Sequence, residues 1–496
     1  MDNMIIAPLL GCLITALFTL LFFSHKGLQR FIHLLGTIFY LFFTAYLYWL
    51  VQQKGLLFFR LGNHPAGFAI SFILDDFSCL MLLITAITVL AVSIYSMSDS
   101  TINSKMFFYP AFWFLISGVT GSFSTADLFN LYVWFEVMII SSAVIMTLTR
   151  ENILPGMVYY ITLNVLATLI MLLSISFLYG LSDTLDMAQL ALKSHTYSAA
   201  YLPILTLLII AFAIKSALFP YYFWLPVSYH LTSVSAGGLL AGLLTKVGVY
   251  ALIRIGTLFL SPHSPLMPIL LSLSCLTMLG GVFGAMSDFH IRRILSFHII
   301  SQIGYMTLGI AIGTTFALTA AIFYIIHHIL VKTNLFLISG LLTRYSGYAD
   351  LRQMGGFFQK KPLLTILFFI PAFSLAGLPP LSGFWAKYLI LDAALTSKFW
   401  LSAFLALLVG FFTLYSMIKI WRYVFLQSAE YPMRPISAKD RIFLYSPIFL
   451  LGTLTLFIGL YPQPLYKISG QAAHALLNPS HYLQTVHGKN TTLNGC

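Results

Sequence analysis

Long apolar stretches divide the chain into segments that are each long enough to cross a lipid bilayer. A helix of about 20 apolar residues spans the hydrocarbon core, and the sequence contains fourteen such stretches separated by polar connections. Their approximate ranges are 4–23, 31–51, 78–97, 106–123, 127–148, 158–180, 202–223, 234–256, 268–287, 293–312, 318–341, 363–393, 402–421 and 443–462. The pattern predicts one polytopic membrane domain over residues 1–462 and a C-terminal tail over residues 463–496.

The first long connection, from Gln52 to Phe77, has a different pattern. Its segment RLGNHPAGFAISF alternates apolar and polar residues on both sides of a Gly-Asn-His-Pro turn. Such alternation around turn residues is typical of a β-hairpin. We therefore expect a short hairpin outside the membrane at this place.

Composition excludes a soluble protein. Of the 496 residues, 59% are hydrophobic and 8% are charged, whereas about 25% of the residues of a soluble domain are charged. The four cysteines lie far apart, and no glycine-rich nucleotide motif follows a strand pattern. We therefore expect neither a metal site nor a cofactor.

Basic residues set the expected orientation. An even number of spans places both termini on one side, and the connections of the opposite side carry roughly twice as many Lys and Arg residues. The positive-inside rule then places both termini outside. This bias accounts for most of the net charge of +12, so no nucleic-acid partner is expected.

Four lysines are not accounted for by the connections and lie within the apolar stretches, and one acid lies in the middle of a span: Lys215, Lys246, Lys332 and Lys387, and Glu136. Each costs about 3 kcal/mol at the centre of a bilayer, so five together imply a function. Two alternatives stay open. A lysine near the end of a span can reach the headgroups, as Lys246 or Lys332 would, and Glu136 can serve as a structural partner of a lysine.

Prolines accompany two of the lysines. Pro220 follows Lys215 by five residues, and Pro379 with Pro380 precedes Lys387. Proline interrupts helical hydrogen bonding, and non-helical backbone at membrane depth must line protein or water. Transporters build ion sites at such breaks. We expect broken seventh and twelfth helices, each with a small hydrated pocket beside its lysine.

These groups suggest a proton relay. A carboxylate near a lysine favours its protonated form, and a dry environment disfavours it. A Lys–Glu pair of variable separation is therefore a proton switch, and we expect Glu136 and Lys215 to form it. Lys246 is expected to receive the proton, with Tyr250 one helical turn further on.

The relay is expected to continue through the segment HHILVKTNLF. His328 and Lys332 lie four residues apart and share one helix face. Histidine titrates nearest neutrality, which suits a relay, although a single histidine such as His327 or His328 is often only a hydrogen-bonded core residue. Lys387 is expected to end the relay.

The spans fall into two sets of five. Residues from about 106 to 256 and from about 268 to 421 each form such a set, and each set contains a proline break with a lysine. Five is odd, so the sets have opposite orientations, as in an inverted repeat. The expected fold is an all-α membrane protein with about fourteen transmembrane helices and two inverted five-helix repeats.

Five sequence blocks resemble the antiporter-like membrane subunits shared by respiratory complex I, membrane-bound hydrogenases and Mrp cation/proton antiporters. They are DLFNLYVWFEVM, AIKSALFPYYFWLP, LLTKVGVYALIR, DFHIRRILSFHIISQIGYM and LAGLPPLSGFWAKYLI. By this resemblance, Glu136 matches the fifth-helix glutamate that pairs with the seventh-helix lysine, here Lys215. Lys246 matches the central lysine of the eighth helix, and His328 with Lys332 matches the relay region of the eleventh.

Within this family, the sequence is most similar to the D-type subunits of Mrp Na⁺/H⁺ antiporters. The hairpin segment and RRILSFHIISQIGYM carry that similarity, and Lys387 takes the twelfth-helix position, where one complex I subunit class has glutamate. The resemblance implies a subunit of a bacterial cytoplasmic-membrane complex that exchanges Na⁺ or another monovalent cation for H⁺, with other membrane subunits as partners. The alternatives are a proton-pumping subunit of a NADH:quinone or hydrogenase-type oxidoreductase and, less favoured, a membrane scaffold.

Overall fold

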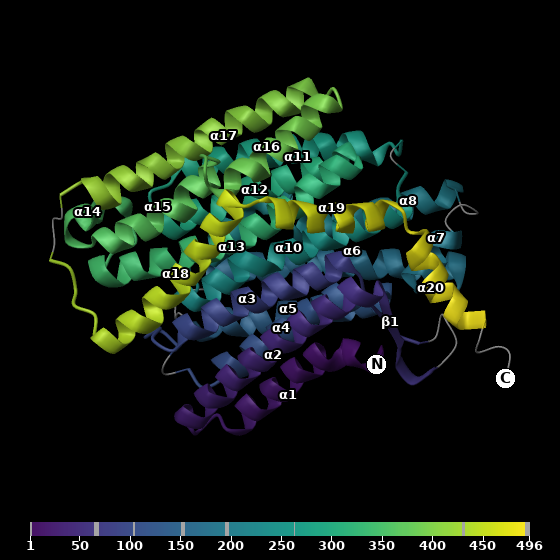
Figure 1. Ribbon diagram of the computed structural model, residues 1–496, viewed down its shortest axis with the longest axis horizontal. Coiled ribbons are helices and arrows are strands. Elements are labelled where there is room, and N and C mark those ends of the chain that lie inside the picture. Colours follow the sequence, from purple (N-terminus) through teal and green to yellow (C-terminus); the bar gives the residue numbers. More distant parts are fainter. Residues whose placement is uncertain are drawn as a thin grey trace.

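The computed structural model describes residues 2–63, 69–102, 105–149, 154–193, 198–261, 263–428 and 432–491, and these are almost entirely helical (Figure 1). The first ten helices are α1 (Ala7–Leu21), α2 (Lys26–Lys54), α3 (Asp76–Ser96), α4 (Phe108–Ser124), α5 (Leu128–Thr149), α6 (Leu154–Ser182), α7 (Met187–Lys193), α8 (Ser198–Lys215), α9 (Trp224–Tyr229) and α10 (Val234–Phe259). The next ten are α11 (Leu266–Ser287), α12 (Ile291–Ile312), α13 (Thr315–Ser346), α14 (Phe357–Lys360), α15 (Pro362–Ala376), α16 (Ser382–Thr396), α17 (Trp400–Trp421), α18 (Ala438–Leu460), α19 (Gln463–Leu477) and α20 (Ser480–Thr491).

Within these described ranges, 11 helices are long and apolar enough to cross a membrane. The other predicted spans coincide with shorter elements: α4 has 17 residues, and α8 and α15 end at the expected breaks. The long helices run along the longest axis of the molecule, and the N- and C-terminal ends lie at the same end of the bundle (Figure 1). The helical architecture that the hydrophobic pattern predicts is confirmed.

The centre of the bundle consists of α10, α12 and α13, which are almost wholly buried. The helix α13 is 32 residues long and contacts α10, α12, α16, α18 and α19. Outer helices such as α6, α17 and α18 instead expose large apolar side chains, among them Leu169, Phe411 and Phe449. An apolar outer belt matches the hydrocarbon of a bilayer, so polar side chains concentrate on the central helices.

The expected hairpin is present between α2 and α3. Strands β1 (Leu57–Arg60) and β2 (Ser71–Leu74) pair antiparallel, with Leu57 opposite Leu74. The His-Pro part of the predicted turn, within residues 64–68, lies outside the described residues. The hydroxyl of Ser71 donates to Asp186 over 2.8 Å, which attaches the hairpin to the segment before α7.

Two membrane helices are interrupted where the sequence predicts. The helix α8 ends at Lys215, and the chain passes through the short turn η4 (Tyr221–Phe223) before α9 begins. The helix α15 ends at Ala376, and α16 begins at Ser382 after the Pro379–Pro380 pair. Each interruption places backbone carbonyls and a lysine together inside the bundle, because the helical ladder is absent there.

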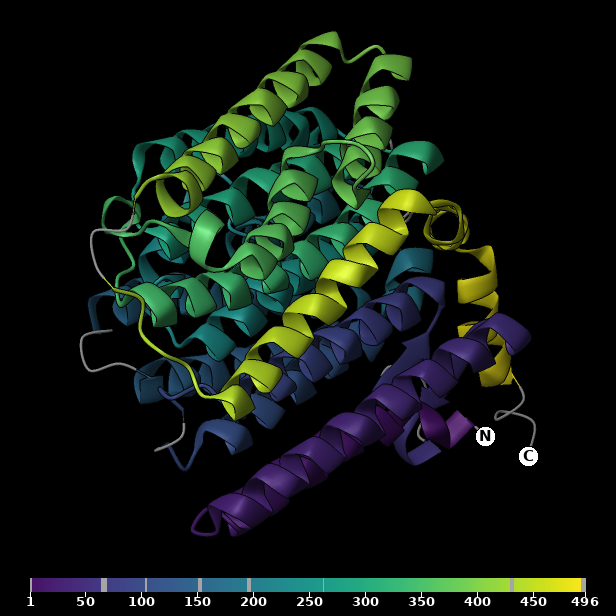
Figure 2. The same cartoon turned by 60° about the vertical axis from the view of Figure 1, so that its left-hand side comes forward.

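The C-terminal segment, for which the sequence predicts only a tail, contains two helices within its described residues. The helix α19 buries Ser469, Ala472 and Leu476 in its contact with α13 and α3, and these residues share one helical face. The helix α20 buries Tyr482 against the hairpin and α7. Figure 2 shows these yellow helices following α18 along one side of the bundle.

Candidate functional site

The predicted ionisable residues come from five helices. Glu136 lies on α5, Lys215 ends α8, and Lys246 lies on α10. The central helix α13 carries His328 and Lys332, and Lys387 lies on α16. Both lysines of the central pair, Lys246 and Lys332, are fully buried. They therefore do not reach the headgroups, and the alternative that they lie at the membrane surface is wrong.

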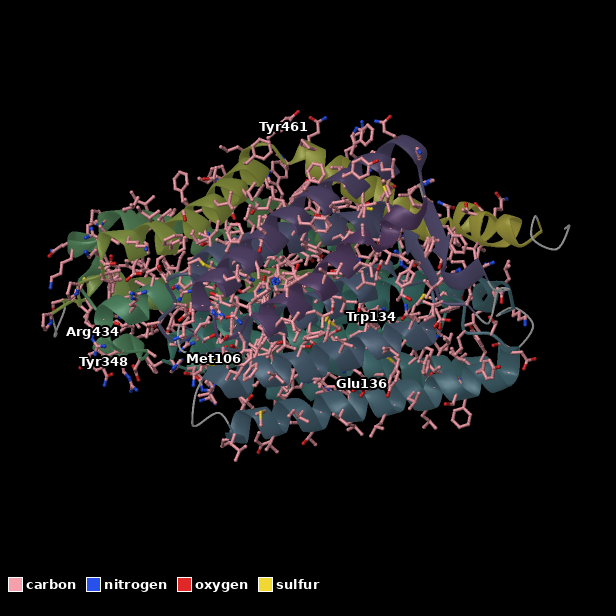
Figure 3. The ribbon with its side chains drawn as sticks, turned by 90° about the horizontal axis from the view of Figure 1, so that it is seen from below. Met106, Trp134, Glu136, Tyr348, Arg434 and Tyr461 are labelled. Atoms are coloured by element: carbon pink, nitrogen blue, oxygen red, sulfur yellow. The ribbon has the colours of Figure 1, made fainter. Side chains whose placement is uncertain are left out.

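Glu136 and Lys215 lie near each other without direct contact. The half-buried Glu136 carboxylate acts electrostatically on Lys215, yet no ion pair of 4.0 Å or less joins them among the described residues. Within the same residues, the Lys215 ammonium has no hydrogen-bond partner, and it lies 5.3 Å above the ring of Phe135. Figure 3 shows Glu136 well away from the end that carries Met106 and Arg434. The two charged groups therefore lie apart in this structure.

A small cavity adjoins Lys215. It has a volume of about 20 Å³ and is lined by Phe135, Tyr160, Trp224 and Leu244 as well as the lysine. That volume holds about one water molecule. The described part of the chain offers the Lys215 ammonium no partner, and a buried ammonium group without a protein partner favours a water molecule beside it.

Two buried hydroxyls belong to the chain neighbours of Lys215 and Lys246. The Oγ of Ser216 and the Oγ1 of Thr245 have no hydrogen-bond partner in the described ranges. Gly248 allows their helices to approach, because a Cβ there would lie 2.6 Å from the Ser216 Oγ. Thr245 lies three residues before Gly248 and therefore on the same face of α10. Hydroxyls both donate and accept hydrogen bonds, so these two are candidates to bind water near the lysines.

If the groups form the proton relay that the sequence predicts, Thr245→Val is expected to slow cation/proton exchange about tenfold without preventing folding, because the shape is kept and the hydroxyl is lost. The measurement is the initial rate of exchange in everted vesicles. Thr257→Val is the matched control, since the Thr257 hydroxyl on the same helix donates to the Ile253 carbonyl over 2.9 Å. Equal rates for both variants would remove Thr245 from the path.

Lys246, His328 and Lys332 form a central group between α10 and α13. The Lys246 ammonium donates to the carbonyl of Ala241 over 2.6 Å, and that of Lys332 donates to the carbonyl of Leu295 over 3.2 Å. His328 interacts electrostatically with both lysines, and its two ring nitrogens have no hydrogen-bond partner among the residues that the structure describes. The structure thus brings together the three central groups that the sequence predicts.

Tyr250 does not belong to this group. Its hydroxyl donates to the Phe123 carbonyl over 2.9 Å, and the guanidinium of Arg254 donates to it over 2.9 Å. The Lys246 ammonium extends the other way along α10, toward Ala241. The Tyr250 hydroxyl is therefore engaged with Phe123 and with Arg254 near the end of α10.

Lys387 lies at the second helix break. Its ammonium donates to the carbonyl of Ala376 over 2.9 Å, one of the carbonyls that Pro379 and Pro380 leave without a helical donor. A cavity of about 230 Å³ adjoins the lysine, and the ring of Tyr305 lies 5.4 Å from its nitrogen. The break thus provides a hydrogen-bond acceptor and space beside the lysine, although the residues that line the cavity are mostly apolar.

The break also holds His327. Its Nδ1 lies 2.8 Å from the hydroxyl of Ser382, which is 3.0 Å from that of Ser374. Gly383 makes this close approach possible, because a Cβ there would lie 1.7 Å from the Ser374 carbonyl oxygen. His327 is therefore attached to the broken helix, whereas His328 faces the central lysines.

His298 on α12 is a further candidate that the sequence reasoning missed. It is fully buried, its Nε2 lies 2.9 Å from the Ser416 hydroxyl, and it interacts electrostatically with Lys332 and Lys387. It therefore provides an ionisable group that interacts with both the central group and Lys387 at the second break. The signal was present in the sequence, since His298 is an ionisable residue within a predicted span.

Among the described residues, no group of three or more His, Cys, Asp and Glu could hold a metal ion. Glu136 is the acidic residue of the predicted series, and the other members are lysines and a histidine. Such groups can exchange protons by changing their protonation state. The series does not supply the oxygen ligands that hard cations such as Na⁺ require.

This bundle, with membrane-length helices and ionisable groups at two helix breaks, defines a multi-pass helical membrane protein. Residues 125–413 match the family described as NADH:quinone oxidoreductase/Mrp antiporter, TM, and the chain belongs to that family. The resemblance seen in the five sequence blocks is confirmed.

Relatives match the chain over nearly its whole length. The D subunit of the Na(+)/H(+) antiporter of Alkalihalophilus pseudofirmus is 39% identical over 98% of this chain and 99% of its own. The corresponding D subunit of Bacillus subtilis is 34% identical, with the same coverage of 98% and 99%. A chain in the structure of the Mrp complex from Dietzia sp. superimposes with a TM-score of 0.91 at 29% identity, over 98% of this chain and 100% of that one.

Proposed function

We propose that the chain is the proton-translocating subunit of a multisubunit Na⁺/H⁺ antiporter. The relatives that match its full length are named as subunits of such antiporters, which favours this function over membership of an oxidoreductase. The observation that carries the proton role is the series of ionisable groups from Glu136 to Lys387, whose central members are buried. Partner membrane subunits complete the complex.

The relay begins at the first break. When Glu136 approaches Lys215, the carboxylate stabilises the protonated lysine, and when they separate, the proton passes through water near Thr245 to Lys246. His328 then transfers it to Lys332. The electrostatic interactions of His328 with both central lysines support its place between them in the relay.

The second half leads to Lys387. His298 interacts electrostatically with both Lys332 and Lys387 and carries the proton from one to the other, and water in the cavity beside Lys387 completes the route. Movement of the break changes the contact of Lys387 with the Ala376 carbonyl, which gives this end a switch as well. The chain thus supplies the proton half of the exchange.

The number of spans and the inverted repeats are part of the same proposal. Fourteen spans, with inverted repeats over about 106–256 and 268–421, form the membrane domain of residues 1–462. The repeat arrangement is supported by the two helix breaks, since each repeat contains one break with a lysine. Both termini lie outside a bacterial cytoplasmic membrane, which is supported by their position opposite the end that carries Arg434 (Figures 1 and 3).

The test is exchange by the complete complex with and without this subunit. Everted vesicles from a host that lacks its own Na⁺/H⁺ antiporters are energised by respiration, and NaCl is added to dissipate the pH gradient. We expect a response only when the subunit is present. A complex that exchanges Na⁺ for H⁺ equally well without it would disprove the function.

A further inference from the structure

A second polar cavity lies outside the relay, at the end of the bundle opposite the termini. It has a volume of about 420 Å³ and is bounded by the ends of α3 and α13, the beginnings of α10 and α12, and the segment before α18. Figure 3 shows Arg434 at this end, together with Met106 and Tyr348. Three guanidinium groups line the cavity: Arg292, Arg344 and Arg434.

The acidic groups at this cavity already accept hydrogen bonds or form an ion pair within the protein. One oxygen of Asp99 accepts hydrogen bonds from the backbone nitrogen and hydroxyl of Thr101, over 3.1 and 2.6 Å. The other accepts from the nitrogen and hydroxyl of Ser235, over 3.1 and 2.8 Å. Asp440 pairs with Arg344 over 2.8 Å. Asp99 therefore serves to cap α10. It also lines the cavity, where three guanidinium groups outnumber its one carboxylate and leave the lining with a net positive charge.

The arginines are held in place by backbone groups. Arg292 donates to the carbonyl of Thr232 over 2.5 Å, and Arg344 donates to that of Ser98 over 2.5 Å. Arg434 lies against Gly347, where a Cβ would be 2.7 Å from its Nη2. Gly347 has a φ of +84°, so both its conformation and the close guanidinium favour glycine. The wall is thus shaped around Arg434, which has no ion pair within the described residues.

We propose that this cavity binds a phosphate group, and that an anionic phospholipid headgroup supplies it. Guanidinium groups bind phosphate through paired hydrogen bonds, and basic pockets between membrane helices on the arginine-rich side suit lipid headgroups. The cavity lies where several spans end, which is the level of the headgroups. Free phosphate has the same chemistry and is the alternative source.

A phosphate in this cavity links helices that carry the relay. Arg292 begins α12, Arg344 ends α13, and Arg434 precedes α18. The same α13 bears His328 and Lys332. The ligand therefore braces the end of the central helix against its neighbours, and its effect on stability does not depend on proton transfer.

The test compares the melting temperature of the purified, delipidated complex after addition of phosphatidylglycerol, phosphatidylcholine or inorganic phosphate. Wild type is expected to be stabilised by phosphatidylglycerol and not by phosphatidylcholine. Arg434→Gln is expected to need about fivefold more phosphatidylglycerol for the same shift, since one arginine is lost. Lys439→Gln, an exposed cation at the start of α18, is the matched control and should respond as wild type does.

Each further outcome bears on the assignment. Stabilisation by inorganic phosphate that is also weakened in Arg434→Gln supports the site and makes free phosphate its ligand. If Arg434→Gln does not assemble, Arg434→Lys keeps the charge without the paired donors and is expected to bind between the two. Equal phosphatidylglycerol responses in wild type, the Arg434 variant that assembles and Lys439→Gln, with no response to phosphate, would overturn the proposal.

Discussion

Lys215→Ala is expected to lower Na⁺/H⁺ exchange by at least about a hundredfold, because a positioned proton-transfer group contributes that much or more. The Lys215 ammonium is buried, has no hydrogen-bond partner in the described part of the chain and adjoins a cavity that holds about one water. Removing it breaks the path between Glu136 and Lys246. The measurement is the NaCl-induced loss of the pH gradient in everted vesicles that contain the complete complex.

Three variants separate this chemistry from a structural effect. Lys467→Gln changes an exposed lysine on α19 and should leave the rate unchanged. Lys215→Arg keeps a cation that does not release its proton, so it should be nearly as slow as Lys215→Ala. Glu136→Gln keeps the shape and removes the charge, so it should also be slow. Wild-type rates for Lys215→Ala and Glu136→Gln would end the relay assignment.

The sequence predicted the membrane helices well because the hydrocarbon core imposes a minimum length of apolar residues. It placed their ends less well. The predicted span over 318–341 corresponds to α13, which extends over Thr315–Ser346. Its last turns carry Thr343 and Arg344, whose side chains are satisfied by hydrogen bonds to the backbone of Ser339 and Ser98. A hydropathy pattern does not contain such contacts.

The C-terminal helices show a second limit of prediction from hydropathy. The face of α19 that contacts α13 consists of small residues such as Ser469, Ala472 and Ala473. Small residues allow close helix packing within membranes, but they contribute little to hydropathy. The segment therefore resembled a tail, although its periodicity was helical.

The candidate site was predictable to the extent that the bilayer penalises charge. Lysines within apolar stretches stand out because each is costly, and the structure places Lys246 and Lys332 with His328 between α10 and α13. His298 was overlooked because a neutral histidine carries little penalty. Asp75 and Arg254 were overlooked because they lie near the ends of spans, where charges are common, and are 179 residues apart.

Asp75→Asn is expected to destabilise the subunit by roughly 3–5 kcal/mol, the usual effect of removing one partner from a buried ion pair. Arg254 donates to both oxygens of Asp75, over 2.5 and 2.9 Å, and to the hydroxyls of Ser78 and Tyr250, each over 2.9 Å. The amide of asparagine leaves the guanidinium buried without its counter-charge. The measurement is the melting temperature of the purified complex and the amount recovered from membranes.

The neighbouring Asp76 provides the control, because it also bears a carboxylate but accepts a hydrogen bond from Gln52 at the surface, over 2.7 Å. Asp76→Asn should change stability by less than about 1 kcal/mol. Adding Arg254→Met to Asp75→Asn should recover part of the loss, since no uncompensated charge remains. If the two asparagine variants were equally stable, the pair would not be a structural element.

The same ion pair also bears on transport, because it joins the start of α3 to the end of α10, and α10 carries Lys246. A loosened pair is therefore expected to slow exchange indirectly, by letting α10 shift relative to its neighbours. The recovery in the Asp75→Asn, Arg254→Met double variant distinguishes this indirect loss from that of Lys215→Ala. No second substitution on α10 should restore exchange to Lys215→Ala, since the group that holds the proton is gone.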